Sequence, residues 1–450
     1  MNRSELFKKY DVPAPRYTSY PTVPYWSTTP TKEEWLQSVQ DTLMEDETTW
    51  SMYIHIPFCE SFCTYCACNT STTKDHSKEA EYIAALHQEW NIYASNFSLL
   101  SEKPLRQIHI GGGSPSFLSA ENMRVMLTPI LELANISHDA FDASVEVDPR
   151  TTTEDQLKVL HDLGFSRISI GVQDFNEEVQ RLVNRVQPRE ITERVAQMAR
   201  AIGYYSVNFD LIYGLPKQTP EAMRHTVETT VALKPDRIAL YSLAIVPWIK
   251  PAHRKFKDSD LPTGEAKRKL YEIAVDMLLE AGYVEIGMDH FALPHDTLNT
   301  ARQAGKLHRN FMGYTENRTD LLLALGASSI SESKSCYHQN EKVLPVYLRR
   351  LANGELPTHR GHLLTDEDKV QKQRILSLMT RGEILFDDRS AITRCSDLLE
   401  PLINDGVITI DGTHLKVTEA GKPFLRNVAM ALDFRLRDDK PETKVFSQAV

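Results

Sequence analysis

The chain has 450 residues, of which 41% are hydrophobic, and its formal net charge is -10. This is enough sequence for one large domain and a smaller one, each with a buried core. The acidic balance argues against a general nucleic-acid binder, which needs a basic face to neutralise phosphates. No apolar run approaches the roughly 18 residues that span a membrane, and residues 1–10 are polar and charged, unlike a signal peptide. We therefore expect a soluble, cytoplasmic protein.

The first expected strand, Met52–Pro57, leads directly into a cysteine-rich loop, PFCESFCTYCACN. Three of its cysteines, Cys59, Cys63 and Cys66, have the spacing Cys-x3-Cys-x2-Cys. Three thiolates spaced in this way can converge on one face of a 4Fe-4S cube and leave the fourth iron open for a ligand. Structural zinc is the alternative, but it usually takes ligands from two separated knuckles, and no second Cys/His pair follows at the usual distance. A disulfide framework is implausible in a chain of this length.

Short apolar or β-branched runs alternate with amphipathic helical patterns as far as about residue 245. The runs expected as strands are Met52–Pro57, Gln107–Gly111, Ala143–Val147, Arg167–Val172, Ser206–Tyr213 and Arg237–Ser242. The helical patterns include Lys78–Tyr93, Ala120–Leu133, Arg189–Ile202 and, further on, Gly264–Leu279. This alternation predicts parallel βαβ units. We expect an incomplete (β/α)6 barrel, open on one side, with the cysteine loop at the end of the first strand, where α/β barrels keep their active sites.

A change of pattern near Gly354 predicts a second, smaller domain. Helical patterns there are followed by Gly406–Val417, in which Asp411-Gly412 between alternating apolar runs predicts a β-hairpin. Helices with such a hairpin are typical of a winged helix, which we expect to act as a lid together with the arm around Arg16. The expected regions are an N-terminal arm (1–45), a catalytic domain (46–353) and a mainly helical, winged-helix-like domain (354–450).

Several stretches resemble one known family, in the same order along the chain. The cysteine loop, with Tyr65 just before its third cysteine, resembles the signature of radical S-adenosylmethionine (SAM) enzymes. The rest is similar to the oxygen-independent coproporphyrinogen III oxidase (dehydrogenase) family over nearly the whole chain. The matching stretches are PRYTSYPT at Pro15–Thr22, YIHIPFC at Tyr53–Cys59, GGGSPSFL at Gly111–Leu118, SVEVDPR at Ser144–Arg150, GVQDFNEEVQRLVNR at Gly171–Arg185, FDLIYGLPKQT at Phe209–Thr219 and GMDHFALP at Gly287–Pro294.

The resemblance implies anaerobic oxidative decarboxylation of two propionates of coproporphyrinogen III to vinyls. The products would be protoporphyrinogen IX, CO2, methionine and 5'-deoxyadenosine, in haem biosynthesis. The implied cofactors are one 4Fe-4S cluster and SAM, two per turnover, which supply a 5'-deoxyadenosyl radical. The implied partners are coproporphyrinogen III and a reduced electron-donor protein such as flavodoxin or ferredoxin, with no nucleic acid and no membrane span. We expect a monomer.

The resemblance also implies roles for individual residues. Cys59, Cys63 and Cys66 would ligate the cluster, and Cys68 would be catalytic beside it without ligating iron. Contacts to the cluster-bound SAM are implied for Tyr53, Gly112, Glu146 and Ile330. Contacts to a second SAM are implied for Tyr65, Gly113, Ser114, Gln173, Arg185, Asp210 and Ala244.

Each of these roles has a plainer alternative. The glycine run Gly111–Gly113 can be only a tight turn. Glu146, Gln173 and Asp210 stand near strand ends, where a polar side chain can simply cap the next helix. Arg185 can cover a helix surface with its stem.

Two residues depart from the family pattern, and two other functions compete. Ile245 stands where relatives carry His or Tyr, and Met312 where many have Gln, which puts the seating of the second SAM or the substrate in doubt. The haem-binding chaperone branch of the superfamily usually has an aromatic residue where this chain has Cys68. A DNA-binding regulator with a winged helix is disfavoured by the acidic charge. Candidates for binding the substrate propionates, with exposed surface arginines as the alternative, are Arg16, Arg302, Arg309 and Arg318.

Overall fold

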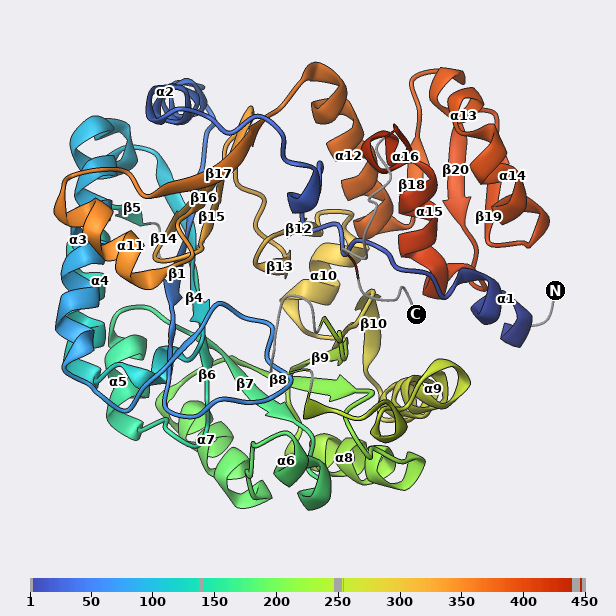
Figure 1. Ribbon diagram of the computed structural model, residues 1–450, viewed down its shortest axis with the longest axis horizontal. Coiled ribbons are helices and arrows are strands. Elements are labelled where there is room, and N and C mark those ends of the chain that lie inside the picture. The colour runs from blue at the N-terminus through green and yellow to red at the C-terminus, as the bar shows by residue number, and fades with distance from the viewer. Residues whose placement is uncertain (1–2, 137–140, 247–252, 254, 439–445, 447–450) are drawn as a thin grey trace.

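Six parallel strands form the centre of the protein, in the spatial order β9-β8-β7-β6-β4-β1 (Figure 1). The structure is a computed structural model that describes residues 3–136, 141–246, 253, 255–438 and 446. The strands are β1 (Trp50–Ile56), β4 (Pro104–Gly112), β6 (Asp142–Val147), β7 (Arg167–Gln173), β8 (Ser206–Tyr213) and β9 (Arg237–Ser242). Each overlaps an expected strand, so the predicted α/β fold with an incomplete (β/α)6 barrel is confirmed.

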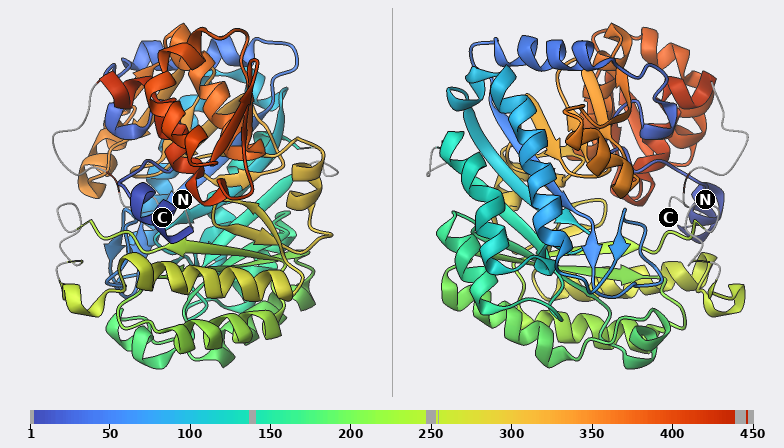
Figure 2. Two further views of the ribbon diagram at one scale, coloured as in Figure 1. Left: turned by 90° about the vertical axis from the view of Figure 1, so that its right-hand side faces the viewer. Right: turned by 60° about the vertical axis from the view of Figure 1, so that its left-hand side comes forward.

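Helices cover the outer face of these strands (Figures 1 and 2). They are α3 (Lys78–Asn96), α4 (Ala120–Leu133), α5 (Glu154–Asp162), α6 (Glu177–Leu182), α7 (Arg189–Ile202), α8 (Pro220–Leu233) and α9 (Gly264–Glu280). Ser119, Thr153 and Thr219 each accept a backbone N–H of the helix that follows, which satisfies one donor at its N-terminus. These polar caps explain where α4, α5 and α8 begin.

The strands separate apolar from polar side chains by simple alternation. In β7, Ile168, Ile170 and Val172 are buried in the core. The intervening Ser169 and Gly171 line a cavity on the inner side of the sheet. Because successive side chains of a strand point to opposite faces, one short sequence builds both the core and the cavity wall.

The sheet continues beyond both ends of the parallel core, to thirteen strands in the described part of the chain. Beside β1 lie β14 (Leu321–Leu325), β15 (Ile330–Glu332), β16 (Cys336–Asn340) and β17 (Thr358–Leu363). Beside β9 lie β11 (His290–Ala292) and β10 (Val284–Gly287), and β5 (Asn135–Ile136) pairs with β4. These additions were not predicted. Strand β17 pairs with β16 although it follows the boundary expected after residue 353, and the division into three regions stays a prediction.

The C-terminal part combines helices with a three-stranded sheet of order β18-β20-β19. Its elements are α12 (Asp366–Arg381), β18 (Glu383–Leu385), α13 (Ser390–Arg394), α14 (Ser396–Asn404), β19 (Ile408–Asp411), β20 (His414–Val417), α15 (Leu425–Ala431) and α16 (Phe434–Asp438). The predicted hairpin is β19–β20, and Gly412 at its turn has a φ of 58°, which glycine adopts readily. The predicted helical, winged-helix-like character is confirmed.

The N-terminal arm connects the two hydrophobic cores. Helix α1 (Arg3–Tyr10) places Leu6 and Phe7 in the core of the C-terminal part. Helix α2 (Lys32–Leu43) places Trp35 and Val39 in the core of the main sheet. Figure 1 shows the arm, in blue, running between these two regions. Further elements are α10 (Thr297–Gln303), β12 (His308–Asn310) and β13 (Gly313–Thr315). Helix α11 (Leu344–Ala352) packs beside α3 and places Tyr347 and Leu351 in the core of the main sheet.

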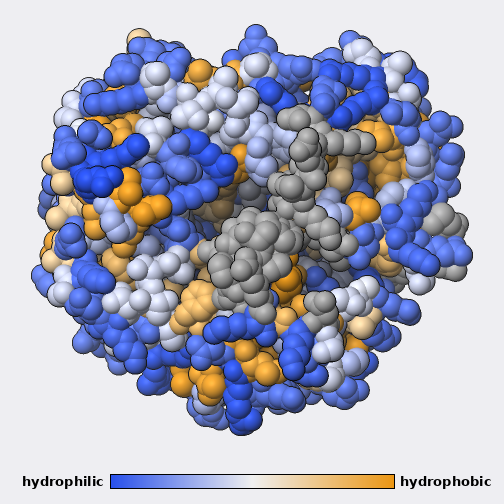
Figure 3. Space-filling view, viewed as in Figure 1, coloured by the Kyte–Doolittle hydropathy of each residue, from blue (hydrophilic) through white to orange (hydrophobic). Residues whose placement is uncertain are grey.

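Among the described residues, no helix is both long and apolar enough to span a bilayer. Figure 3 shows hydrophilic residues over most of the face seen in Figure 1, with apolar residues in scattered patches.

Candidate active site

A cavity of about 640 Å³ lies on the inner side of the parallel strands. Its wall contains most of the residues that the sequence singles out: Cys59, Cys63, Tyr65, Cys66, Cys68, Gly112, Gly113, Ser114, Glu146, Gln173, Arg185, Asp210 and Ala244. The carboxyl ends of parallel strands meet at one edge of a barrel, which explains why residues so far apart in the sequence converge here.

Tyr53 and Ile330 do not line this cavity. Tyr53 lies behind it, with its hydroxyl 3.1 Å from Nδ1 of His55 and its ring stacked on His109, at 5.9 Å between ring centroids. Ile330 begins β15 and pairs with Gln339. The implied SAM contacts of both residues stay predictions.

The cysteine loop is fixed by hydrogen bonds from several elements. Cys59 ends the short strand β2 (Phe58–Cys59), which pairs with β3 (Ser71–Thr72). The backbone N–H of Thr64 donates to Val183 O at 3.0 Å, and that of Cys66 donates to Cys63 O at 3.0 Å. Cys63 is buried, whereas Cys68 is exposed, and none of the chain's six cysteines forms a disulfide.

The three thiols of the spaced motif lie close enough to influence one another. Burial, with smaller contributions from the neighbouring Cys66 and Cys63, raises the pKa of Cys59 to about 12. No three Cys, His, Asp or Glu side chains in the described residues are arranged as a site for a single metal ion. A cube holds each thiolate on a different iron, so its ligands stand further apart than those of one ion. Soft thiolates on one loop beside a cavity fit an iron-sulfur cluster.

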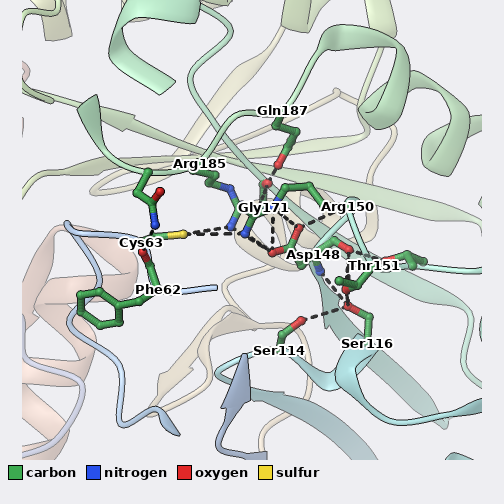
Figure 4. A network of polar contacts seen from close by, with 12 residues as sticks. Phe62, Cys63, Ser114, Ser116, Asp148, Arg150, Thr151, Gly171, Arg185 and Gln187 are labelled. Carbon is green, nitrogen blue, oxygen red and sulfur yellow. Dashed lines mark hydrogen bonds and ion pairs between the residues drawn. The ribbon is translucent and has the colours of Figure 1, made fainter. Parts of the chain in front are cut away.

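Two arginines flank the Cys63 thiol (Figure 4). Arg185 places Nη1 3.6 Å from Cys63 Sγ, and Arg150 places Nη2 3.8 Å from the same sulfur. Both also contact the Asp148 carboxylate, at 3.3 Å and 2.6 Å. Their positive charges would offset the negative charge of a thiolate that ligates metal. Arg185 is buried and donates to Gly171 O at 2.6 Å, so its interpretation as a surface residue is wrong.

The glycine run is required by close packing between β4 and the cysteine loop. A Cβ at Gly112 would lie 2.7 Å from Ile56 O, and one at Gly113 would lie 2.8 Å from Phe58 O. Gly112 also has a φ of 121°, which other residues rarely adopt. The backbone N–H of Gly113 donates to Ile56 O at 2.7 Å. These glycines therefore have a structural role whether or not they also approach a ligand.

Two carboxylates, Glu146 on β6 and Asp210 on β8, line the same cavity and differ in the direction of their pKa shifts. Glu146 accepts from Gly112 N and pairs with His109 Nε2, both at 3.3 Å. Burial raises its pKa, but these contacts outweigh burial, and the net shift lowers it. Burial and the charge of Glu146 raise the pKa of Asp210 to about 6, although Ser169 and Asn208 donate to it at 2.9 Å each.

Neither carboxylate caps a helix, because both accept from strand or turn residues. Gln173 reaches the cavity through a β-bulge. The register of β7 against β8 shifts between Gly171 and Gln173, and Gln173 has a φ of 70°. Bulges of this kind re-aim side chains beside active sites.

Sequence reasoning missed several cavity residues. His109, Ser144, Ser169 and Asn208 all line the wall. The signal was present in the strands, where polar residues alternate with buried apolar ones. A search for strand positions that face inward would have found them.

The arginines proposed to bind the propionates, and the two residues that depart from the family pattern, differ in whether they line the cavity. Arg16 and Met312 line the cavity, and Ile245 packs against the same small hydrophobic cluster as Tyr65. Arg309 is buried, whereas Arg302 and Arg318 are exposed and do not line the cavity.

Comparison with known proteins supports the same interpretation. The profile of the Radical SAM superfamily matches residues 53–230. The oxygen-independent coproporphyrinogen III oxidase of Pseudomonas aeruginosa is 37% identical over 440 residues, covering 96% of this chain and 95% of its own. The enzyme of the same name from Escherichia coli is 38% identical over 457 residues, covering 99% and 98%.

A solved structure shows the same fold over almost the full length. The structure of coproporphyrinogen III oxidase from Escherichia coli, described as a radical SAM enzyme, superimposes with a TM-score of 0.88 at 38% identity. The match covers 93% of this chain and 97% of that one. This chain therefore belongs to the oxygen-independent coproporphyrinogen III oxidase family of the radical SAM superfamily.

Proposed function

We propose that this protein oxidatively decarboxylates two propionates of coproporphyrinogen III to vinyls without oxygen, giving protoporphyrinogen IX for haem biosynthesis. The observation that carries the proposal is the convergence of the Cys59, Cys63 and Cys66 loop with the inward-facing residues of β6 to β8 at one cavity. Its volume of about 640 Å³ lies within the range of ligand pockets. The full-length similarity to enzymes of this name supports the substrate.

The family uses a 4Fe-4S cluster and SAM. Reductive cleavage of SAM at the cluster would supply the radical that removes hydrogen from a propionate. In this chain Cys59, Cys63 and Cys66 would hold the cluster. Arg185 and Arg150 would stabilise the Cys63 thiolate, since both guanidinium groups lie beside its sulfur.

The cluster-bound SAM would be held by residues on β1, β4, β6 and β15. These are Tyr53, Gly112, Glu146 and Ile330. A carboxylate with a lowered pKa, as in Glu146, is charged at neutral pH and can accept hydrogen bonds from a ligand.

A second SAM, making two per turnover, would contact Tyr65, Gly113, Ser114, Gln173, Arg185, Asp210 and Ala244. All of these residues line the one cavity. Two identical decarboxylations that each consume one radical need two SAM molecules, bound together or in turn. Cys68 is exposed in the same wall and would act on the substrate without ligating iron.

The wider setting is part of the proposal. A reduced flavodoxin or ferredoxin would supply electrons, and the protein would act as a cytoplasmic monomer. The haem-binding chaperone alternative is not favoured, because the relatives of nearly full length are named oxidases.

The proposal is tested by anaerobic incubation of the reconstituted protein with coproporphyrinogen III, SAM and a chemical reductant. Products are oxidised to porphyrins and separated by chromatography with fluorescence detection. We expect protoporphyrin, with no product when SAM is omitted. Stable haem binding without any conversion of coproporphyrinogen would instead indicate the chaperone.

A further inference from the structure

An arginine pair stands where the N-terminal arm meets the far end of the parallel strands. Arg16 belongs to the arm and lines the cavity, with its guanidinium 5.4 Å from the centre of the Tyr241 ring on β9. Nη2 of that guanidinium is paired with the Asp289 carboxylate. Strand β9 is at the opposite end of the six-strand core from β1, which leads into the cysteine loop. Arg16 therefore provides positive charge at the cavity wall remote from β1.

Arg309 lies directly behind this wall in β12. Its Nη2 donates to the backbone oxygen of Arg16 at 3.5 Å, and its guanidinium stacks on Tyr314, 4.5 Å from the ring centre. Tyr314 itself lines the cavity. Arg309 is only 6% exposed, and its Nε and Nη1 have no hydrogen-bond partner in the described residues. Two buried nitrogen atoms without an acceptor on a charged side chain are costly, so an acceptor is expected to reach them.

Asp289 is the carboxylate that pairs directly with Arg16. Arg309 lies close enough for its charge to act on the same carboxylate. Arg426 adds a third guanidinium that donates to the backbone oxygens of Pro15 and Ala14 and so fixes the segment that carries Arg16. Burial, together with the charge of Arg16, lowers the pKa of Arg426 to about 10. An anionic ligand would supply the acceptor that Nε and Nη1 of Arg309 lack.

The chemistry of the wall indicates which anion fits. Arg16 lines the cavity together with Tyr241, Tyr314 and Met312, so the wall combines a guanidinium group with aromatic and apolar side chains. A ligand with a large apolar ring system and carboxylates on short chains matches both features.

We propose that Arg16 and Arg309 together bind a carboxylate of the substrate, and that this carboxylate belongs to a propionate that the reaction leaves intact. This inference rests on the proposed function. Loss of CO2 requires a carboxylate to give up its negative charge, and two guanidinium groups stabilise that charge in the ground state. Such a clamp would oppose decarboxylation of the propionate it holds, so the reacting propionates must lie elsewhere.

The test is anaerobic equilibrium dialysis of the full-length, cluster-containing protein against three probes. Coproporphyrinogen III carries four carboxylates, protoporphyrinogen IX carries two, and the tetramethyl ester of coproporphyrinogen III carries none. Bound ligand is quantified after oxidation to the fluorescent porphyrin. Arg309→Met and Arg16→Met are each expected to weaken binding of both acids by about tenfold to a hundredfold, as for loss of a charge-assisted hydrogen bond. Binding of the ester should change less than twofold.

Two further variants separate binding from folding. Arg309→Lys keeps the charge but not the fork, and should bind the acids with an intermediate affinity. Arg194→Met removes an exposed arginine on α7 and should bind like the unsubstituted protein. Iron content and thermal stability report on folding, and Arg16→Met carries the test if Arg309→Met does not fold.

Unchanged affinity for coproporphyrinogen III in both methionine variants would overturn the inference while leaving the proposed function intact. Loss of affinity for coproporphyrinogen III but not for protoporphyrinogen IX would also overturn it, because the clamp would then hold a reacting propionate. Failure of the unsubstituted protein to bind coproporphyrinogen III at all would instead overturn the proposed function.

Discussion

Replacement of Asp210 by Asn is expected to stabilise the protein while impairing its proposed reaction. The carboxylate of Asp210 accepts from Ser169 and Asn208, yet burial and the nearby charge of Glu146 raise its pKa from 3.8 to about 6. The folded state therefore holds a charge at neutral pH that its surroundings disfavour. Asn has the same shape without the charge, so the repulsion from Glu146 disappears. Active sites often carry such strain for the sake of function.

The size of the effect follows from the pKa. A rise from 3.8 to about 6 corresponds to roughly 3 kcal/mol. The side chain lines the cavity and is only partly buried, so screening reduces this to about 1 kcal/mol. Because the folded state binds the proton more tightly than the unfolded state, Asp210 lowers stability as pH rises from about 4 through 6. The advantage of Asp210→Asn should therefore be nearly absent below pH 4 and complete above pH 7.

The stability assay uses cluster-free protein without SAM. The unfolding midpoints of the variant and the unsubstituted protein are compared at several pH values between 4.5 and 8. Asp276→Asn, which removes an exposed carboxylate from α9, is the matched control and should show no such pH-dependent gain. A variant that is less stable than the unsubstituted protein at pH 8, or a gain that does not grow with pH, would refute the electrostatic reasoning.

The activity assay uses the cluster-containing protein. Because Asp210 would accept hydrogen bonds from the second SAM, Asp210→Asn should lower conversion of coproporphyrinogen III by about tenfold to a hundredfold. Cleavage of the cluster-bound SAM should persist. Full turnover in this variant would reject the role of Asp210 and favour a single SAM site used twice in sequence.

Two other predictions concern the cysteine loop. Alanine at any of Cys59, Cys63 or Cys66 should abolish the oxygen-sensitive 4Fe-4S absorption and lower iron content, whereas Cys68→Ala should keep the cluster and lose turnover; a full cluster in any of the first three variants would contradict the ligand assignment. Gly113→Ala would place a Cβ 2.8 Å from Phe58 O, so we expect displacement of the loop and poor cluster incorporation, measured as iron per chain. Normal iron content in that variant would show that the backbone can move to accommodate the added Cβ without loss of the cluster.

The parallel core could be predicted from the sequence because its signals are local. Runs such as Ser206–Tyr213 alternate buried apolar and inward polar residues, and the cysteine spacing lies within one loop. The outer strands could not be predicted in the same way. The sequence of β14 is LLLAL, which is equally compatible with a buried strand and with a helix. It forms a strand because it pairs with β1, which is far away in the sequence.

Site residues could be predicted where they belong to a local sequence motif, but not where they come together from segments that are distant in the sequence. Arg185 is 122 residues from Cys63, and nothing near either residue indicates that they touch. The pairing of Arg16 with Asp289 spans 273 residues and depends on how the arm crosses the barrel. The structural need for Gly112 and Gly113 is likewise visible only when the backbone of Ile56 and Phe58 is in place.

We propose that this chain converts two propionates to vinyls by radical SAM chemistry. The most direct measurement is the ratio of products in one anaerobic reaction with coproporphyrinogen III labelled in its propionate carboxyl groups. Protoporphyrinogen IX, released CO2, methionine and 5'-deoxyadenosine are quantified together. We expect two CO2, two methionine and two 5'-deoxyadenosine molecules for each protoporphyrinogen IX formed. Cleavage of SAM without release of labelled CO2, or conversion that proceeds without SAM, would contradict it.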